Sequence, residues 1–216
     1  MTAAAVRQAR ASGVNLSQLV ARALARINAL LPGPATTITI GYGRKYLIPQ
    51  TGTNGFTSPK TGKVMIVFGP TSQTSPKRVL TLWLPRTLAH EVNHSVRILA
   101  GPGFGLGLAE QTITEGIATA LDQAAFPGPP DPWDAAITPA QECKLWKKAQ
   151  PLLNQPGLYD QWMFGGPGIP HWTAFTIGYH IVRGFLRHHP GTRWAAITAD
   201  YDTTISNGSH YQPCPA

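Results

Sequence analysis

The chain has 216 residues, of which 43% are hydrophobic and 13% are charged, and it contains 22 glycines and 20 prolines. The length predicts one domain, or one with a small second lobe, and the hydrophobic fraction is ordinary for a globular protein. The formal net charge is +8, but the basic residues are scattered and no basic run is interleaved with aromatic residues. We therefore expect no nucleic-acid partner.

Residues 1–31 have the pattern of an amphipathic helix, in which apolar side chains recur at helical spacing among arginines. The segment lacks the continuous apolar core that a signal peptide needs. The chain also lacks the run of about 18 apolar residues that a membrane-spanning helix needs. We expect a cytoplasmic protein without an integral membrane segment, or a secreted one if a leader has been removed.

A small sheet is predicted after this helix. Residues 36–40 alternate and are β-branched, and residues 63–68 form an apolar run, so both segments are predicted strands. Residues 46–48 are a shorter candidate strand. Residues 51–55 are rich in turn-forming residues and predict a turn.

The segment His90-Glu91-Val92-Asn93-His94 lies in a predicted helix that covers residues 87–99. On a helix, residues four apart share one face, so His90 and His94 could both reach one metal ion, and imidazole nitrogens suit Zn²⁺. Glu91 lies about 100° around the helix. From there its carboxylate could take the proton of a water that the ion has made more acidic.

A catalytic zinc usually has three protein ligands, and a second predicted helix, residues 113–122, offers the third. Glu115 is the candidate, and the glycine that follows it lets another backbone come close. Glu110 is the rival carboxylate, but it would lie about 140° away on the helix. Asp122, seven residues after Glu115, returns to nearly the same face. It is a candidate for orienting a histidine ligand, although a solvated aspartate at a helix end would have the same position.

The C-terminal part of the chain is predicted to be helical. Helices are expected over residues 138–153, 173–188 and 194–205, separated by glycine- and proline-rich loops. Tyr179 lies at the edge of the apolar arc of the middle helix and is the first candidate to donate a hydrogen bond to the oxyanion of a tetrahedral intermediate. His171, just before that helix, is the second candidate. A buried tyrosine bonded to a carbonyl group would explain Tyr179 equally well.

The two cysteines, Cys143 and Cys214, have no metal-ligand spacing with other cysteines or histidines. They are consistent with a disulfide in an exported protein and with two free thiols in the cytoplasm.

Three blocks in order resemble a known family. The pair His90-Glu91-Val92-Asn93-His94 and Thr114-Glu115-Gly116-Ile117-Ala118 is similar to the gluzincin group of zinc metallopeptidases. With the stretch of residues 169–182, it resembles a bacterial family of predicted zinc-dependent proteases over about residues 80–200. The resemblance implies a zinc ion held by His90, His94 and Glu115, with Glu91 as the general base. It does not imply a particular substrate.

These observations predict a mostly helical α+β chain with a zincin-like fold. The expected single domain covers residues 1–216, with a helix and small sheet in residues 1–78 and a helical catalytic part in residues 79–216. The predicted function is zinc-dependent hydrolysis of peptide bonds in a peptide or protein substrate. An inactive or non-peptidase binding protein on a zincin scaffold is the alternative, and the presence of Glu91 argues against it.

A peptidase of this kind would align its substrate along an edge strand by β-augmentation. The strand within residues 63–68 is our candidate, although a core strand would have the same sequence pattern. The substrate-binding residues predicted on it are Val64, Ile66 and Phe68.

Overall fold

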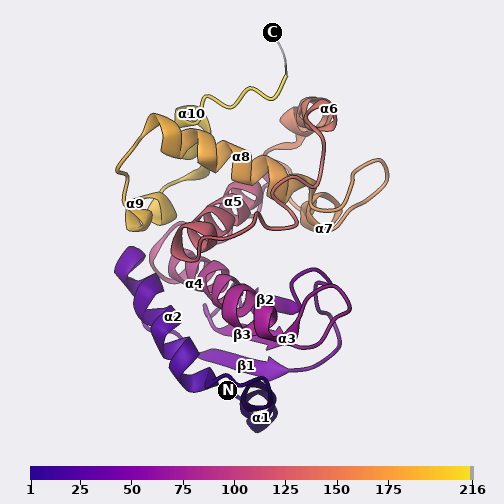
Figure 1. Cartoon of the computed structure of the whole chain (residues 1–216). Helices are drawn as coiled ribbons and strands as arrows, with labels where there is room; N and C mark the ends of the chain where they lie inside the picture. The colour runs from indigo at the N-terminus through magenta and orange to yellow at the C-terminus, as the bar shows by residue number, and fades with distance from the viewer. Residues whose placement is uncertain (215–216) are drawn as a thin grey trace. The chain divides into compact units, whose positions relative to one another are not determined.

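The computed structural model describes residues 1–214, which divide into two compact units (Figure 1). Unit 1 comprises residues 1–101 and 121–128, and unit 2 comprises residues 102–120 and the chain from residue 129 onward. One helix, α5 (Leu108–Ala125), contributes to both units. The division therefore does not fall at residue 78. The expected single domain stays a prediction.

Unit 1 contains a small sheet and the helices on either side of it in the sequence. Its elements are α1 (Ala3–Ala11), α2 (Leu16–Leu30), β1 (Ile38–Tyr42), β2 (Thr53–Thr57), β3 (Val64–Phe68), α3 (Pro76–Arg78), the π-helical segment Val79–Trp83 and α4 (Leu84–Ala100). The helix predicted for residues 1–31 is two helices, because Gly13 takes a positive φ of 74° after α1 and the Asn15 side chain caps the start of α2.

The sheet has the strand order β1-β3-β2, with β1 parallel and β2 antiparallel to β3. The prediction that β3 is an edge strand is therefore wrong, because both of its edges are paired. The side chains of Val64, Ile66 and Phe68 are buried in the core of unit 1. They are core residues and have no exposed surface with which to bind a substrate.

The second strand lies in a segment for which the sequence predicts a turn. Residues 46–48 form no strand, and β2 (Thr53–Thr57) takes the outer position next to β3. β2 packs against α4, which also contacts β3 (Figure 1). The His90-to-His94 segment belongs to α4, and the edge strand β2 packs against this helix.

Unit 2 is helical, apart from its loops. Its elements beyond the shared α5 are α6 (Pro139–Ala149), a 3₁₀ turn (Gln150–Leu152), α7 (Tyr159–Met163), α8 (Thr173–His188), α9 (Trp194–Ala199) and α10 (Asp202–Gly208). α8 has the predicted bounds and packs with α6, α7 and α10. The predicted helix over residues 194–205 is two short helices. The mostly helical α+β class with a small sheet is confirmed.

α5 and α8 approach each other closely at two glycines. A Cβ atom on Gly116 would lie 2.3 Å from the carbonyl oxygen of Gly178, and one on Gly178 would lie 2.0 Å from the carbonyl oxygen of Thr112. Side chains at either position would push the two backbones apart. This confirms the prediction that the glycine after Glu115 admits a second backbone, and it fixes α5 against α8.

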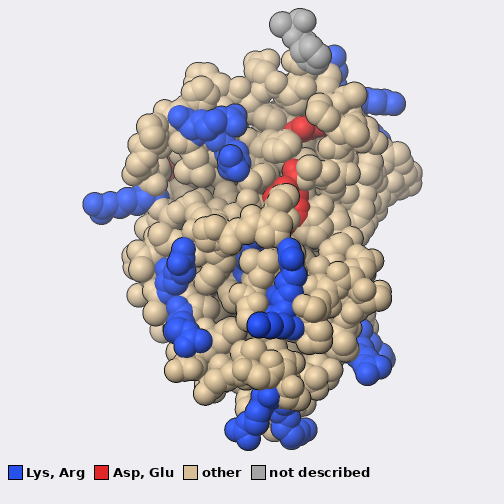
Figure 2. Space-filling model, in the orientation of Figure 1, with Lys and Arg blue, Asp and Glu red and all other residues tan. Residues whose placement is uncertain are grey.

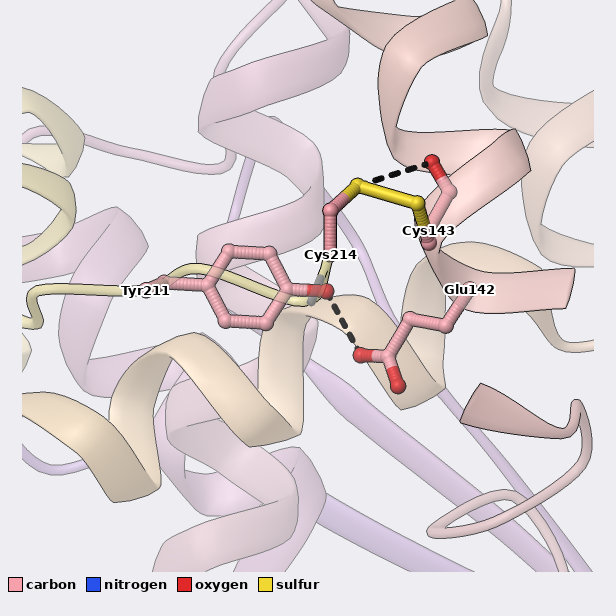
Figure 3. Close-up of a disulfide and its surroundings, with 4 residues drawn as sticks. All are labelled: Glu142, Cys143, Tyr211 and Cys214. Carbon is pink, nitrogen blue, oxygen red and sulfur yellow. Dashed lines mark hydrogen bonds between the residues drawn. A yellow bond between two sulfur atoms is a disulfide. The ribbon is translucent and has the colours of Figure 1, made fainter. Parts of the chain in front are cut away.

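Cys143 and Cys214 form a disulfide that joins α6 to the C-terminal segment across 71 residues of sequence (Figure 3). The sequence alone is consistent with a disulfide and with two free thiols. The structure contains the disulfide, and the location of the protein stays a prediction. No helix in residues 1–214 is long and apolar enough to cross a membrane.

Candidate metal centre

α4 carries both histidines of the motif. α4 continues directly from the π-helical segment Val79–Trp83, carries Pro85 in its first turn, and ends before Gly101. His90 and His94 are buried, and their rings meet edge to face with centroids 4.7 Å apart. The helix predicted for residues 87–99 is confirmed, and it brings the two imidazoles together.

Asp122 lies beside the first of these histidines. Its Oδ2 atom is 3.5 Å from Nδ1 of His90, and the side chain is buried. Asp122 belongs to the part of α5 that lies in unit 1. A carboxylate at Nδ1 suits an imidazole that uses its other nitrogen, Nε2, as a ligand.

Glu91 is held by β2. The hydroxyl of Thr57 donates to Oε2 of Glu91 over 2.7 Å and lies 3.0 Å from the carbonyl oxygen of the same residue. One turn earlier on α4, the hydroxyls of Thr53 and Thr87 form a 2.8 Å hydrogen bond. These side-chain bonds fix the edge strand to the helix and set the direction of the Glu91 carboxylate.

Gly55 leaves the space that this carboxylate occupies. A Cβ atom at Gly55 would lie 2.4 Å from Oε1 of Glu91 and 2.5 Å from its Cγ atom. Any other residue would collide with the Glu91 side chain. Oε2 is thus held by Thr57, and Oε1 lies beside the bare backbone of β2.

Glu115, in unit 2, is buried and held by a tyrosine. The hydroxyl of Tyr159, on α7, donates to Oε1 of Glu115 over 2.7 Å. The rival carboxylate, Glu110, accepts hydrogen bonds of 2.9 Å from the backbone N–H groups of Leu106 and Gly107. Glu110 thus caps the start of α5, which agrees with the preference for Glu115 as a ligand.

The donor set fits a zinc ion. In the described part of the chain, one group of at least three potential ligand residues could hold a metal ion, namely His90, His94 and Glu115, whose ligand atoms all lie within 4.8 Å of one another. All three residues are buried. Two imidazole nitrogens and one carboxylate form a donor set of the kind that zinc enzymes use, and a zinc ion held by three protein ligands would have a further position for water or substrate.

The two oxyanion candidates have other contacts in unit 2. The hydroxyl of Tyr179 accepts a 2.7 Å hydrogen bond from Nη1 of Arg183, and burial, followed by the charge of Asp134, raises the pKa of Tyr179. His171 is exposed and lies between the rings of Phe164 and Trp172. The role of either residue in catalysis stays a prediction.

Three residues around the candidate centre were not predicted from the sequence. Gly55 lies in the predicted turn of residues 51–55, and Thr57 follows it in a segment for which no strand is predicted. Tyr159 is 44 residues away from the glutamate that it contacts. Nothing in the local pattern marks them. The sequence of residues 159–172 is consistent with a mobile lid and with a loop held to the core by its aromatic residues, and neither alternative indicates which side chain the segment would meet.

Comparison with known proteins assigns the chain to a family. Residues 16–206 match the family described as "Predicted Zn-dependent protease (DUF2268)", and the chain belongs to that family. The match supports a zinc protease, as the motif predicts. No curated protein and no solved structure matches the chain.

Proposed function

We propose that the protein is a zinc-dependent metallopeptidase of the gluzincin type with a zincin-like fold. His90, His94 and Glu115 would hold the zinc ion, and Glu91 would act as general base. The observation that carries the proposal is the grouping of these three ligand residues on helices. In Glu91, Oε2 accepts a hydrogen bond from Thr57 and Oε1 lies beside Gly55. Membership of a family described as zinc-dependent proteases supports the same function.

Zinc in this site would make a water molecule more acidic and polarise the scissile carbonyl group. Side chains would carry out the proton transfer and stabilise the oxyanion. Thr57 occupies Oε2 of Glu91, so Oε1 is the atom that would take the proton from the attacking water and deliver it to the leaving amine. Tyr179 or His171 would donate to the oxyanion, as the sequence suggests.

Two further side chains would steady the ligands. Asp122 would orient His90 through Nδ1, and Tyr159 would hold Glu115 through Oε1. Partners of this kind fix the direction of a metal ligand and raise its affinity for the metal. Asp122 and Glu115 lie seven residues apart on α5, which places them on nearly the same face of that helix.

The open edge of β2 replaces β3 as the proposed substrate strand. The hydrogen bond from the N–H of Ser58 to the carbonyl of Lys63 sets the alternation of the antiparallel pair. Phe56 therefore directs its backbone groups toward β3, and Gly55 directs its own toward the open edge. Within residues 1–214 no strand pairs with that edge. An extended peptide bound there would lie beside Oε1 of Glu91.

The test is hydrolysis of a mixed peptide library, with the new termini read by mass spectrometry. We expect cleavage by the wild-type protein, loss of cleavage with a zinc chelator, and recovery when zinc is restored. The Glu91→Gln variant should bind zinc as the wild type does and cleave at least a thousandfold more slowly. A zinc-loaded wild-type protein that cleaves no peptide would favour the alternative, a binding protein on a zincin scaffold.

A further inference from the structure

Unit 2 has a pocket of about 540 Å³ whose lining includes Tyr179, one of the two oxyanion candidates, and none of the proposed metal ligands. α6, α8 and the C-terminal segment of residues 209–213 form its walls. Basic side chains predominate in its lining, and they are Arg183, Arg187, His180, His188 and His210. Figure 2 shows Lys and Arg side chains gathered on the face where Figure 1 draws α8 and α10.

The one acidic residue in the lining, Glu142, is already engaged. Its Oε1 atom lies 2.8 Å from Nδ1 of His180. The same atom lies 2.5 Å from the hydroxyl of Tyr211, and Figure 3 shows this second contact. Burial, and then Glu142 itself, raises the pKa of Tyr211, so this hydroxyl stays protonated and donates. Among residues 1–214, neither Arg183 nor Arg187 forms an ion pair. Glu142 is the single acidic side chain in the lining and does not balance the charges of the two arginines.

Arg183 is held in place while most of its donors stay available. Nη1 donates to the hydroxyl of Tyr179, and the guanidinium carbon lies 5.5 Å from the centroid of the same ring. A guanidinium has five N–H donors in a planar fork that matches carboxylate and phosphate oxygens. Arg187 follows four residues later, on the same face of α8. Two like charges at this spacing destabilise a helix by themselves, and a bound anion would reverse that effect.

The C-terminal wall of the pocket is firmly attached. Gly184 admits the chain, since a Cβ atom there would lie 2.6 Å from the carbonyl oxygen of Ser209. The disulfide fixes the far end of this wall to α6. His210 has a φ of 51°, in the left-handed region, and its ring lies 4.4 Å from that of His188. A strained residue kept in place by its surroundings is often found at binding sites.

We propose that this pocket binds a small anionic ligand whose carboxylate or phosphate group is held by Arg183 and Arg187. The histidines at its rim would add donors, and Glu142, with its anchors, would keep the two walls together. This inference does not depend on the peptidase activity, because none of these side chains belongs to the candidate metal centre.

The experiment is calorimetric titration of the full zinc-loaded chain with inorganic phosphate and, separately, with glutarate. We expect saturable binding of at least one probe, and the tighter probe identifies the class of the natural anion. The variant Arg183→Gln/Arg187→Gln should bind at least tenfold more weakly. The matched control, Arg7→Gln/Arg10→Gln, removes two exposed arginines of α1 and should bind within twofold of wild type.

Two further variants separate the possible outcomes. Arg187→Gln alone, which loses no hydrogen bond of the folded chain, should weaken binding at least threefold, so that a folding defect at Arg183 does not decide the test. Glu91→Gln should bind as the wild type does, which separates this site from the peptidase. The proposal is overturned if neither probe binds, or if the double variant binds as tightly as its control.

Discussion

Replacing Gly55 with alanine tests the geometry around Glu91 by adding one methyl group. The new Cβ atom would lie 2.4 Å from Oε1 of Glu91, where ordinary contacts begin at 3.4 Å. Thr57 holds the other carboxylate oxygen. The collision therefore cannot be relieved by rotating the carboxyl group alone, and the side chain or β2 must move by about 1 Å.

A displacement of about 1 Å in a catalytic group costs about a hundredfold in rate, which corresponds to about 2.7 kcal/mol of transition-state stabilisation. For Gly55→Ala we expect kcat/KM to fall by about this factor on the best peptide from the library. Zinc content should stay near the wild-type value, because none of the three ligands is touched. The free energy of unfolding should fall by about 1–3 kcal/mol, as for other overpacked sites.

Gly41→Ala is the matched control for this experiment. Gly41 lies on β1, the other edge strand, and the nearest atom to a Cβ there is 3.9 Å away. The control should keep kcat/KM within twofold of wild type. If Gly55→Ala hydrolyses peptides as fast as Gly41→Ala does, Glu91 is not the base in the position described, and the reasoning fails.

Three further predictions concern the supports of the site and the fold. Thr57→Val removes the hydrogen bond to the carboxylate and should lower kcat/KM by about tenfold, measured at saturating zinc; an unchanged rate would mean that this bond has no catalytic effect. Tyr159→Phe removes the donor to Glu115 and should weaken zinc binding by about 10- to 100-fold in a chelator competition, whereas equal affinity would exclude a supporting role. Cys214→Ser opens a disulfide that spans 71 residues, and urea unfolding of oxidised protein should show a loss of about 4 kcal/mol. Coincident unfolding curves would show that the bond does not stabilise the fold.

The parts of the structure that local pattern determines could be predicted from the sequence. The helix with His90 and His94 follows from apolar spacing, with Pro85 near its start and Gly101 at its end. The capping box of Thr138 and Gln141 at the start of α6 is likewise a local signal, because it joins residues three apart in the sequence. Signals of this kind act over a few residues, so they can be recognised from the sequence alone.

The sequence-based predictions are wrong or incomplete where tertiary contacts determine the local structure. β2 has a sequence that predicts a turn, and hydrogen bonds from Thr53 and Thr57 to α4 help to hold it as a strand. The order of strands in the sheet is also non-local, so residues 63–68 gave no sign that β3 is central. Tyr159 reaches Glu115 from a different helix. None of these contacts produces a periodic pattern of residues from which it could be predicted.

Elemental analysis of purified protein tests the central claim most directly. Metal content is measured on wild type, Glu115→Ala and Glu91→Gln after exposure to zinc and removal of the excess. We predict about one zinc ion per wild-type chain, as a three-ligand site requires, a clear loss in Glu115→Ala, and an unchanged content in Glu91→Gln. Wild-type protein without zinc after this treatment would contradict the account.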